Sequence, residues 1–362
     1  MGMIPVILLI AGLLLLAAGA EALVRGAARL AAVMGISPLV IGLTIVSFAT
    51  SAPEMAVSVL SAISGQADIA VGNIVGSNIL NVLLILGLSA AIAPLVVSRK
   101  LIRMDVPIMI GVSFLMLIFA YDEKISRAEG CILFSGIIAY TLFSIHQSKT
   151  EKSYRERQNS RKSDGDMERG NRKIVTNLLL ILGGLASLVL GSQCLVRGAS
   201  SIAKAVGVSE LVIGLTVVAA GTSLPEVATS LVASIRGERD IAVGNVVGSN
   251  IFNILAALGL TGIAAPNGIA VSEAALRFDI PVMIAVAISC LPVFFLGYNI
   301  SRWEGLLFLA YYVAYTAYLI LKSTHHAALP LFSTVMMAFV IPITAVTIIT
   351  LLVRSLRRKR SG

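Results

Sequence analysis

The chain has 362 residues, of which 57% are hydrophobic and only 13% are charged, with a formal net charge of +9. A soluble domain carries about a quarter charged residues, and a chain this apolar would expose large apolar patches in water. The composition therefore excludes a soluble enzyme, a disordered chain and a secreted disulfide scaffold, and it predicts an all-α polytopic membrane protein. The basic residues lie between apolar runs and at the C-terminus, so the positive charge indicates membrane orientation and no nucleic-acid partner.

Apolar runs without charges recur along the chain, each near the roughly 20 residues that a membrane-spanning helix needs. The predicted spans are residues 1–20, 30–53, 69–98, 106–121, 130–148, 174–196, 211–225, 241–272, 280–301, 305–321 and 323–353. In the second and seventh runs the apolar sequence stops at a glutamate, Glu54 and Glu226. Ten of these spans form a predicted core, and the last is an extra C-terminal transmembrane helix.

A polar, charge-dense segment, residues 149–173, separates the fifth span from the sixth. Cytoplasmic loops are enriched in Lys and Arg, so this segment is predicted to be a basic cytoplasmic linker. Five spans before it place the N-terminus outside, and counting forward places the basic tail inside. This orientation assigns most of the 28 lysines and arginines to the cytoplasmic side. We therefore expect a multi-pass protein of the cell (plasma) membrane, in contact with the lipid bilayer, with its long loop and C-terminus in the cytoplasm.

The chain also repeats itself. Shifted by 172 residues, segment 35–88 aligns with segment 207–260, with Thr, Ser, Pro, Glu, Asp and Asn in register. Each half is a five-helix unit, and because five is odd the second unit must enter the membrane in the opposite orientation. Inverted repeats with interrupted helices are typical of secondary transporters. The expected domains are a first repeat over 1–148, an inverted repeat over 174–322, and an additional helix with a basic tail over 323–362.

Each repeat carries a polar cluster in the middle of apolar sequence, namely Ser47, Thr50, Ser51, Pro53 and Glu54 in the first and Thr222, Ser223, Pro225 and Glu226 in the second. Each proline lacks an N–H and so frees a backbone carbonyl. An ionised carboxylate inside a membrane costs several kcal/mol, and the motifs contain no Lys or Arg, so a proton or a cation must stabilise it. Clustered oxygens suit a hard cation such as Ca²⁺. Two negative charges balance one Ca²⁺ or two monovalent ions, which favours exchange.

The span after each cluster carries a polar stripe. It reads GNIVGSNILN in the first repeat and GNVVGSNIFN in the second, with Asn73, Ser77 and Asn81, and then Asn245, Ser249 and Asn253, spaced by four on one helical face. The stripe can bond neighbouring helices or ligate ions, and its glycines allow close helix packing. Asp68 and Asp240 begin these spans and are expected to be helix N-caps, with a role in ion entry as the alternative.

The paired TSAPE and GTSLPE segments, each followed by its polar stripe, resemble the two alpha repeats of the sodium/calcium exchanger family in its prokaryotic form, over roughly residues 1–322. The resemblance implies a ten-helix core, alternating access by sliding of the first and sixth helices, and no cofactor beyond the transported Ca²⁺ and Na⁺. It implies Ca²⁺ ligands at Glu54, Glu226, Thr50 and Thr222, the threonines through main-chain oxygens. It implies Na⁺ ligands at Ser51, Ser77, Ser223, Ser249 and the backbone near Ser47 and Ala219, with Asn81 and Asn253 also at the site.

One feature departs from the family pattern. Positions 81 and 253 are both asparagine here, whereas one of the two is aspartate in well-known members. Two glutamates still neutralise Ca²⁺, so the leading hypothesis is a Ca²⁺/Na⁺ antiporter. The alternatives are H⁺ coupling on the same fold and a passive cation channel; sodium is favoured because the glutamate motifs of proton-coupled relatives are missing. No HExxH, and no GxSxG with a partner histidine, points to an enzyme.

Overall fold

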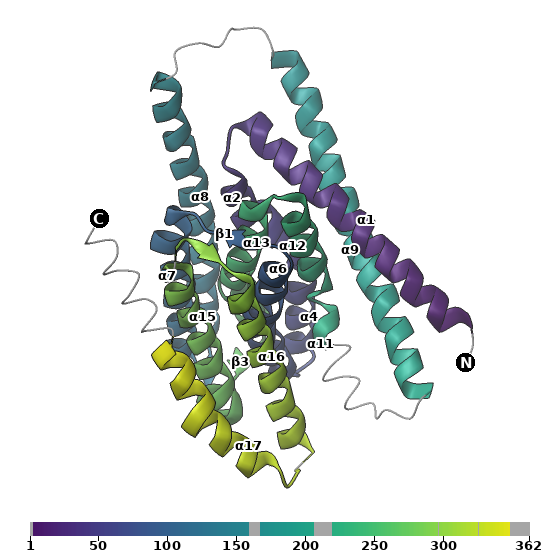
Figure 1. The fold of residues 1–362 in the computed structure, drawn as a ribbon, viewed down its shortest axis with the longest axis vertical. Coiled ribbons are helices and arrows are strands. Elements are labelled where there is room, and N and C mark those ends of the chain that lie inside the picture. Colours follow the sequence, from purple (N-terminus) through teal and green to yellow (C-terminus); the bar gives the residue numbers. More distant parts are fainter. Residues whose placement is uncertain (1–2, 159–166, 206–218, 296, 325, 348–362) are drawn as a thin grey trace.

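The computed structural model of the chain describes residues 3–158, 167–205, 219–295, 297–324 and 326–347. It is almost entirely helical, as the sequence predicts (Figure 1). Within the described ranges, nine helices are long and apolar enough to cross a membrane, and the bent pair Pro38–Thr50 and Ala52–Ile63 forms one more span. The predicted span 211–225 is described only from Ala219 onward, and the basic tail lies outside the described residues.

Where both halves are described, their helices and strands follow the same order, and the second half ends with additional helices; η marks a π-helix. The first half comprises α1 (Met3–Met34), α2 (Pro38–Ile41), η1 (Gly42–Val46), α3 (Ser47–Thr50), α4 (Ala52–Ile63), α5 (Ala67–Leu80), η2 (Asn81–Leu86), α6 (Gly87–Ile92), β1 (Leu95–Val96), η3 (Leu101–Asp105), α7 (Val106–Phe119), β2 (Lys124–Ile125) and α8 (Arg127–Gln158). The second comprises α9 (Met167–Ala205), α11 (Ala219–Gly221), α12 (Leu224–Arg236), α13 (Arg239–Phe252), η5 (Asn253–Leu258), α14 (Gly259–Ala264), β3 (Ile269–Ala270), η6 (Ala275–Asp279), α15 (Ile280–Phe295), β4 (Asn299–Ile300), α16 (Arg302–Ser323), α17 (Leu329–Val335) and η7 (Met336–Val340).

Several helices run beyond the charge-free runs that predicted them. Helix α1 continues past residue 20 because Glu21 is neutralised locally: it pairs with Arg25 one turn later and with Arg236 at the end of α12, whose Nη2 lies 2.8 Å from Glu21 Oε1. At the predicted linker 149–173, the backbone is helical at both ends, since α8 continues to Gln158 and α9 begins at Met167. The length of a charge-free run therefore underestimates the length of the helix wherever charged side chains are paired or reach the membrane surface.

Two short antiparallel strand pairs show that the halves are inverted. Strand β1 of the first half pairs with β4 of the second, and β2 pairs with β3. In the internal repeat, β1 corresponds to β3 and β2 corresponds to β4. A twofold rotation that superposes one half on the other therefore converts the β1–β4 pair into the β3–β2 pair, as expected of inverted halves. The backbone agrees: Val97 N donates to Tyr298 O and Val271 N donates to Glu123 O, both at 2.8 Å. Glu123 and Tyr298, the acceptors in these mirror bonds, both have positive φ.

Helices α1 and α9 form an antiparallel pair on one flank of the bundle (Figure 1). Glycines lie in their contact. A Cβ added at Gly19 would fall 2.7 Å from Gly184 O, and one added at Gly12 would fall 2.7 Å from Leu195 N. The backbones can therefore approach closely, the packing mode that small residues provide in membranes.

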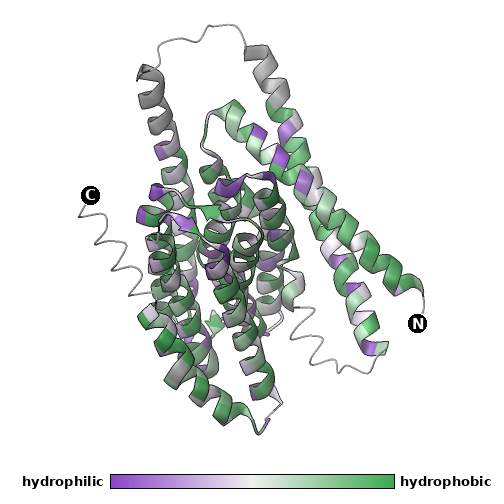
Figure 2. Cartoon of the chain, viewed as in Figure 1, coloured by the Kyte–Doolittle hydropathy of each residue, from purple (hydrophilic) through white to green (hydrophobic). Residues whose placement is uncertain are grey.

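The core lies around helices α5 and α13 with their π-helical continuations η2 and η5. Among the described spans these two are the most enclosed, with 72% and 89% of the residues in their apolar 18-residue stretch buried. Many large hydrophobic residues of the helices around them are exposed, as expected of surfaces in contact with lipid, and the helices are mostly hydrophobic along their length (Figure 2). The last span, Leu329–Thr347, has no buried residue in its apolar 18-residue stretch, so it packs on the outside of the bundle beside α16.

Candidate functional site

Both interrupted helices break at a serine. Helix α3 ends at Thr50 and α4 begins at Ala52, with Ser51 between them at φ −80°, ψ 1°, and the two segments differ in direction by 44°. In the second half Ser223 has nearly the same conformation, φ −89°, ψ 4°, before α12. The following prolines occupy the first helical turn, where a missing N–H costs no hydrogen bond. Each break therefore places the next glutamate in the first turn of a new helix.

Glu54 and Glu226 lie at the centre of the fold, 0% and 1% exposed. Each carboxylate is held by the serine of the other repeat: Ser223 Oγ donates to Glu54 Oε1 at 2.8 Å, and Ser51 Oγ donates to Glu226 Oε1 at 3.2 Å. The second oxygen of each, Oε2, is buried and has no hydrogen-bond partner among the described residues. A buried carboxylate oxygen without a donor is costly, so both oxygens are suited to accept a cation or a proton.

Asn81 and Asn253 supply two more free oxygens. Both side chains are buried, and each residue begins a π-helical segment, η2 or η5, a local widening of the helix that is frequent at functional sites. Asn81 donates its Nδ2 to Asn250 Oδ1 at 3.0 Å, and Asn253 donates its Nδ2 to Asn78 Oδ1 at 3.1 Å. The Oδ1 atoms of both residues are buried with no partner in the described part of the chain.

The remaining stripe asparagines bind the helices together. Asn245 accepts from Thr50 Oγ1 at 3.1 Å and donates to Ser230 Oγ at 3.0 Å. Its mirror residue Asn73 accepts from Thr222 Oγ1 at 3.4 Å and donates to Ser58 Oγ at 2.9 Å. For these two asparagines, the interhelical interpretation of the stripe is supported. The same bonds use the hydrogen of each threonine hydroxyl and orient both side chains toward the stripe asparagines.

The predicted serine ligands differ in their surroundings. Ser77 Oγ lies 3.2 Å from Ser223 Oγ and is therefore linked to the Glu54 carboxylate, whereas Ser249 Oγ is buried without a partner among the described residues. Ser47 uses its hydroxyl for backbone carbonyls, that of Gly42 at 2.7 Å and that of Asn245 at 3.1 Å. Ala219 begins α11, and its side chain lies outside the described residues.

Six residues at this site were missed by the sequence analysis: Asn78, Asn250, Ser58, Ser230, Met109 and Met283. The repeat does contain a signal for the two asparagines, because both polar stripes read SN before the next Asn. A strict spacing of four excluded them, since they lie one position away from the serine of the stripe. The methionines come from α7 and α15, which carry no polar motif.

The chemistry of the site is that of oxygen ligands. No group of three or more His, Cys, Asp or Glu side chains occurs in the described ranges. The two carboxylates, two amide oxygens and neighbouring hydroxyls match the preference of Ca²⁺ and other hard cations for oxygen.

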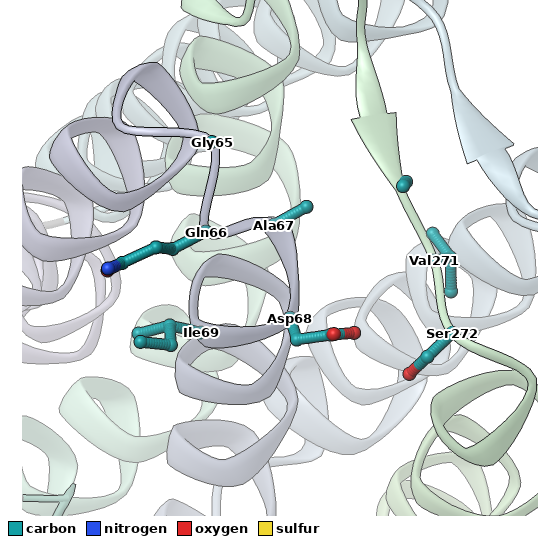
Figure 3. Close-up of a pocket in the computed structure, with 8 residues that line it drawn as sticks. Gly65, Gln66, Ala67, Asp68, Ile69, Val271 and Ser272 are labelled. Carbon is teal, nitrogen blue, oxygen red and sulfur yellow. The ribbon is translucent and has the colours of Figure 1, made fainter.

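The N-cap prediction for the two aspartates is wrong. Gln66 is the N-cap of α5 and Glu238 that of α13, so Asp68 and Asp240 lie in the first helical turn instead. There a carboxylate interacts favourably with the positive end of the helix dipole. Asp68 and Ser272 line a surface cavity of about 490 Å³ between the start of α5 and the residues after β3 (Figure 3).

A protein-family model described as "Sodium/calcium exchanger protein" matches residues 4–146 and 176–321. The chain belongs to the sodium/calcium exchanger family. Membership makes it a multi-pass membrane exchanger rather than an enzyme, and it confirms the resemblance drawn from the two repeated motifs.

Individual relatives agree with this family. The putative antiporter CaxA of Alkalimonas amylolytica is 39% identical over 328 residues, which cover 89% of this chain and all of the relative. The sodium/calcium exchanger MaX1 of Methanosarcina acetivorans is 33% identical and covers 85% of this chain and 96% of its own. The structure of the sodium-calcium exchanger NCX_Mj soaked with 10 mM Na⁺ and no Ca²⁺ superposes with a TM-score of 0.75 at 30% identity, covering 88% of this chain and 99% of that one.

Proposed function

We propose that this protein exchanges Ca²⁺ for Na⁺ across the plasma membrane by alternating access. The observation that carries the proposal is the pair Glu54 and Glu226, each buried in the first helical turn after a helix break and each with one carboxylate oxygen lacking a partner among the described residues. Two carboxylates bind one Ca²⁺ or its charge equivalent in Na⁺, so either load neutralises the site. The name of the relative MaX1, a sodium/calcium exchanger, supports the same ions.

The ligand assignments form part of this proposal. Ca²⁺ is bound by Glu54 and Glu226 with the main-chain oxygens of Thr50 and Thr222. Na⁺ is bound by Ser51, Ser77, Ser223 and Ser249 and by backbone oxygens near Ser47 and Ala219, while Asn81 and Asn253 contribute amide oxygens. The free Ser249 hydroxyl and the free amide oxygens support this distribution.

The orientation and division of the chain belong to the same proposal. The N-terminus lies outside, the segment 149–173 and the tail lie in the cytoplasm, and 1–148 and 174–322 are the working repeats. The strand pairings support the inverted arrangement of the two repeats, because the β1 loop meets the β4 loop and the β2 loop meets the β3 loop; the choice of the cytoplasmic side rests on the distribution of Lys and Arg. The glycine-lined pair α1 and α9, set on one flank, is suited to slide as one body against the core.

The test is Ca²⁺ uptake into sealed vesicles. Vesicles loaded with Na⁺ are compared with vesicles that carry only a pH gradient, each with and without a proton uncoupler. Uptake that needs internal Na⁺ and survives the uncoupler supports sodium exchange. Uptake driven by the pH gradient alone replaces sodium by protons, and uptake indifferent to any counter-ion refutes exchange in favour of a channel.

A further inference from the structure

Helices α1 and α9 lie against one half of the core more than the other. Both pack along α12, the helix that follows the break of the second repeat. In the described ranges neither packs to a comparable extent against α4, the mirror helix of the first repeat. The burial of α1 agrees, because Leu23 and Ala27 are buried whereas Leu14, nearer the N-terminus, is 67% exposed. Figure 1 shows α1 diverging from the core toward its N-terminus.

An ion pair fastens α1 to the end of α12. Arg236, the last residue of α12, donates its Nε to Glu21 Oε2 at 2.9 Å, and its Nη2 lies 2.8 Å from Glu21 Oε1. The guanidinium therefore meets both oxygens of one carboxylate, a geometry that adds specificity to an arginine pair. Glu21 also pairs with Arg25 of its own helix, a contact that is kept wherever α1 moves.

The internal repeat contains no counterpart of this interhelical ion pair. Under the shift of 172 residues, Glu21 corresponds to Gln193 and Arg236 corresponds to Ser64. Both of these mirror residues are exposed. An uncharged amide and a hydroxyl cannot form an ion pair, so this contact distinguishes the two halves.

A hydrogen bond holds α9 to the same half. Ser192 Oγ donates to the main-chain carbonyl of Gly221. Pro225, four residues later, cannot satisfy that carbonyl because proline lacks an N–H. The mirror residues of Ser192 and Gly221 are Ala20 and Ala49, and alanine has no side-chain donor. Both polar contacts that join α1 and α9 to the second repeat are therefore missing from the first.

The inverted repeat gives this asymmetry a consequence for conformational change. In a transporter built of inverted repeats, the second conformation arises when the two halves exchange their arrangements. Helix α1 then packs on α4, as α9 now packs on α12, and α1 leaves α12. The ion pair breaks, and Gln193 and Ser64 meet in its place without forming another. A contact that exists in only one of two conformations shifts the equilibrium toward that conformation.

We propose that Glu21 and Arg236 form a latch that favours the conformation with α1 packed on α12 during alternating access. In the proposed orientation α12 ends in the cytoplasm, so the latch favours the conformation closed on the cytoplasmic side. This inference rests on the proposed alternating access and adds a contact that sets the balance between its two conformations.

The experiment measures that balance by electron paramagnetic resonance. Nitroxide labels are attached to Leu14→Cys in α1 and Leu60→Cys in α4, since these leucines are 67% and 64% exposed. The purified full-length protein is held in lipid nanodiscs, with its three native cysteines replaced by alanine. The labels lie far apart when α1 packs on α12 and approach each other when α1 packs on α4. The two distances therefore report the two populations.

Glu21→Gln and Arg236→Gln should each raise the ratio of short to long distances roughly 2- to 5-fold, the effect of one exposed ion pair on an equilibrium. The double variant should match either single variant, because both lose the same contact. Gln193→Glu with Ser64→Arg should also raise the ratio, because this mirror pair stabilises the opposite conformation. Arg29→Gln is the matched control and should leave the ratio unchanged, since Arg29 is exposed and has no ion pair within the described residues.

A ratio that Glu21→Gln leaves unchanged, or that the mirror pair lowers, would overturn the latch while leaving the exchange function intact. A single distance in all variants overturns it as well, because α1 then does not leave α12. Ca²⁺ uptake into vesicles that follows neither a Na⁺ gradient nor a proton gradient refutes the proposed function. That result comes from a separate assay, so the measured distances decide the latch independently of it.

Discussion

Replacement of Glu54 by glutamine tests the candidate site most directly. Gln has nearly the shape of Glu and keeps an oxygen that can accept from Ser223 Oγ, which lies 2.8 Å from Glu54 Oε1. The substitution therefore preserves packing and removes one negative charge. The proposed Ca²⁺-loaded site then changes from neutral to a net charge of +1.

The size of the effect follows from burial. Glu54 is 0% exposed, so water cannot replace the lost charge. Removal of one partner from a buried, charge-compensated set costs about 3–5 kcal/mol. At about 1.4 kcal/mol per factor of ten, Ca²⁺ affinity is expected to fall by roughly a hundred- to several-thousandfold, which abolishes exchange at ordinary Ca²⁺ concentrations.

The assay is Ca²⁺ binding to purified protein by calorimetry, together with Na⁺-driven uptake in proteoliposomes. Glu304→Gln is the matched control. Glu304 is also a glutamate in the first turn of a helix, but its side chain forms a capping box with Ser301 at the start of α16, a role that Gln also fills. The control should bind and transport like the unmodified protein. Normal exchange by Glu54→Gln, in protein with an unchanged thermal midpoint, would refute the assignment of this carboxylate.

Three further outcomes are expected. Asn250→Leu leaves the Asn81 amide without its acceptor at a cost of about 1–3 kcal/mol, so the free energy of unfolding should fall by that amount; an unchanged free energy of unfolding would refute a stabilising role for this hydrogen bond. Gly184→Ala would place a Cβ 2.7 Å from Gly19 O, forcing α1 and α9 apart, and transport should fall sharply while Gly183→Ala, whose Cβ meets nothing within 4 Å, stays active. Removal of residues 323–362 should leave exchange intact in correctly inserted protein, because the last span is not buried; loss of activity would place that helix in the working unit.

The sequence was sufficient for much of the fold because the membrane imposes a simple rule. A spanning segment must bury its backbone polar groups in its own helix and present apolar side chains, so apolar runs predict the spans. The repeat, with its odd number of spans, then predicts inversion, which the pairing of β1 with β4 and β2 with β3 confirms. Helix ends were predicted less well, because ion pairs such as Glu21 with Arg236 join residues far apart in the chain.

The sequence predicted those residues of the candidate site whose burial in an apolar segment costs free energy in any structural context. A carboxylate inside an apolar run is expensive without a partner, which identified Glu54 and Glu226 before any contact was known. Asn78 and Asn250 escaped because asparagine at a helix contact carries no comparable penalty. The role of these two asparagines depends on the groups that their amides contact in the folded protein. In the sequence they lie one residue after the serine of the polar stripe, so the spacing of four did not include them.

By itself, the sequence determined the helical, multi-pass class of the protein, the inverted repeat, and the presence of two carboxylates within apolar segments. Only the tertiary structure decided how these groups meet: that each glutamate is held by the serine of the opposite repeat, and that the amides of Asn250 and Asn78 donate to the sulfurs of Met109 and Met283. The physical reason is that the free-energy cost of burying a carboxylate can be judged from the residue and the apolar segment around it. The direction of a hydrogen bond, by contrast, depends on the donors and acceptors that other helices bring beside it.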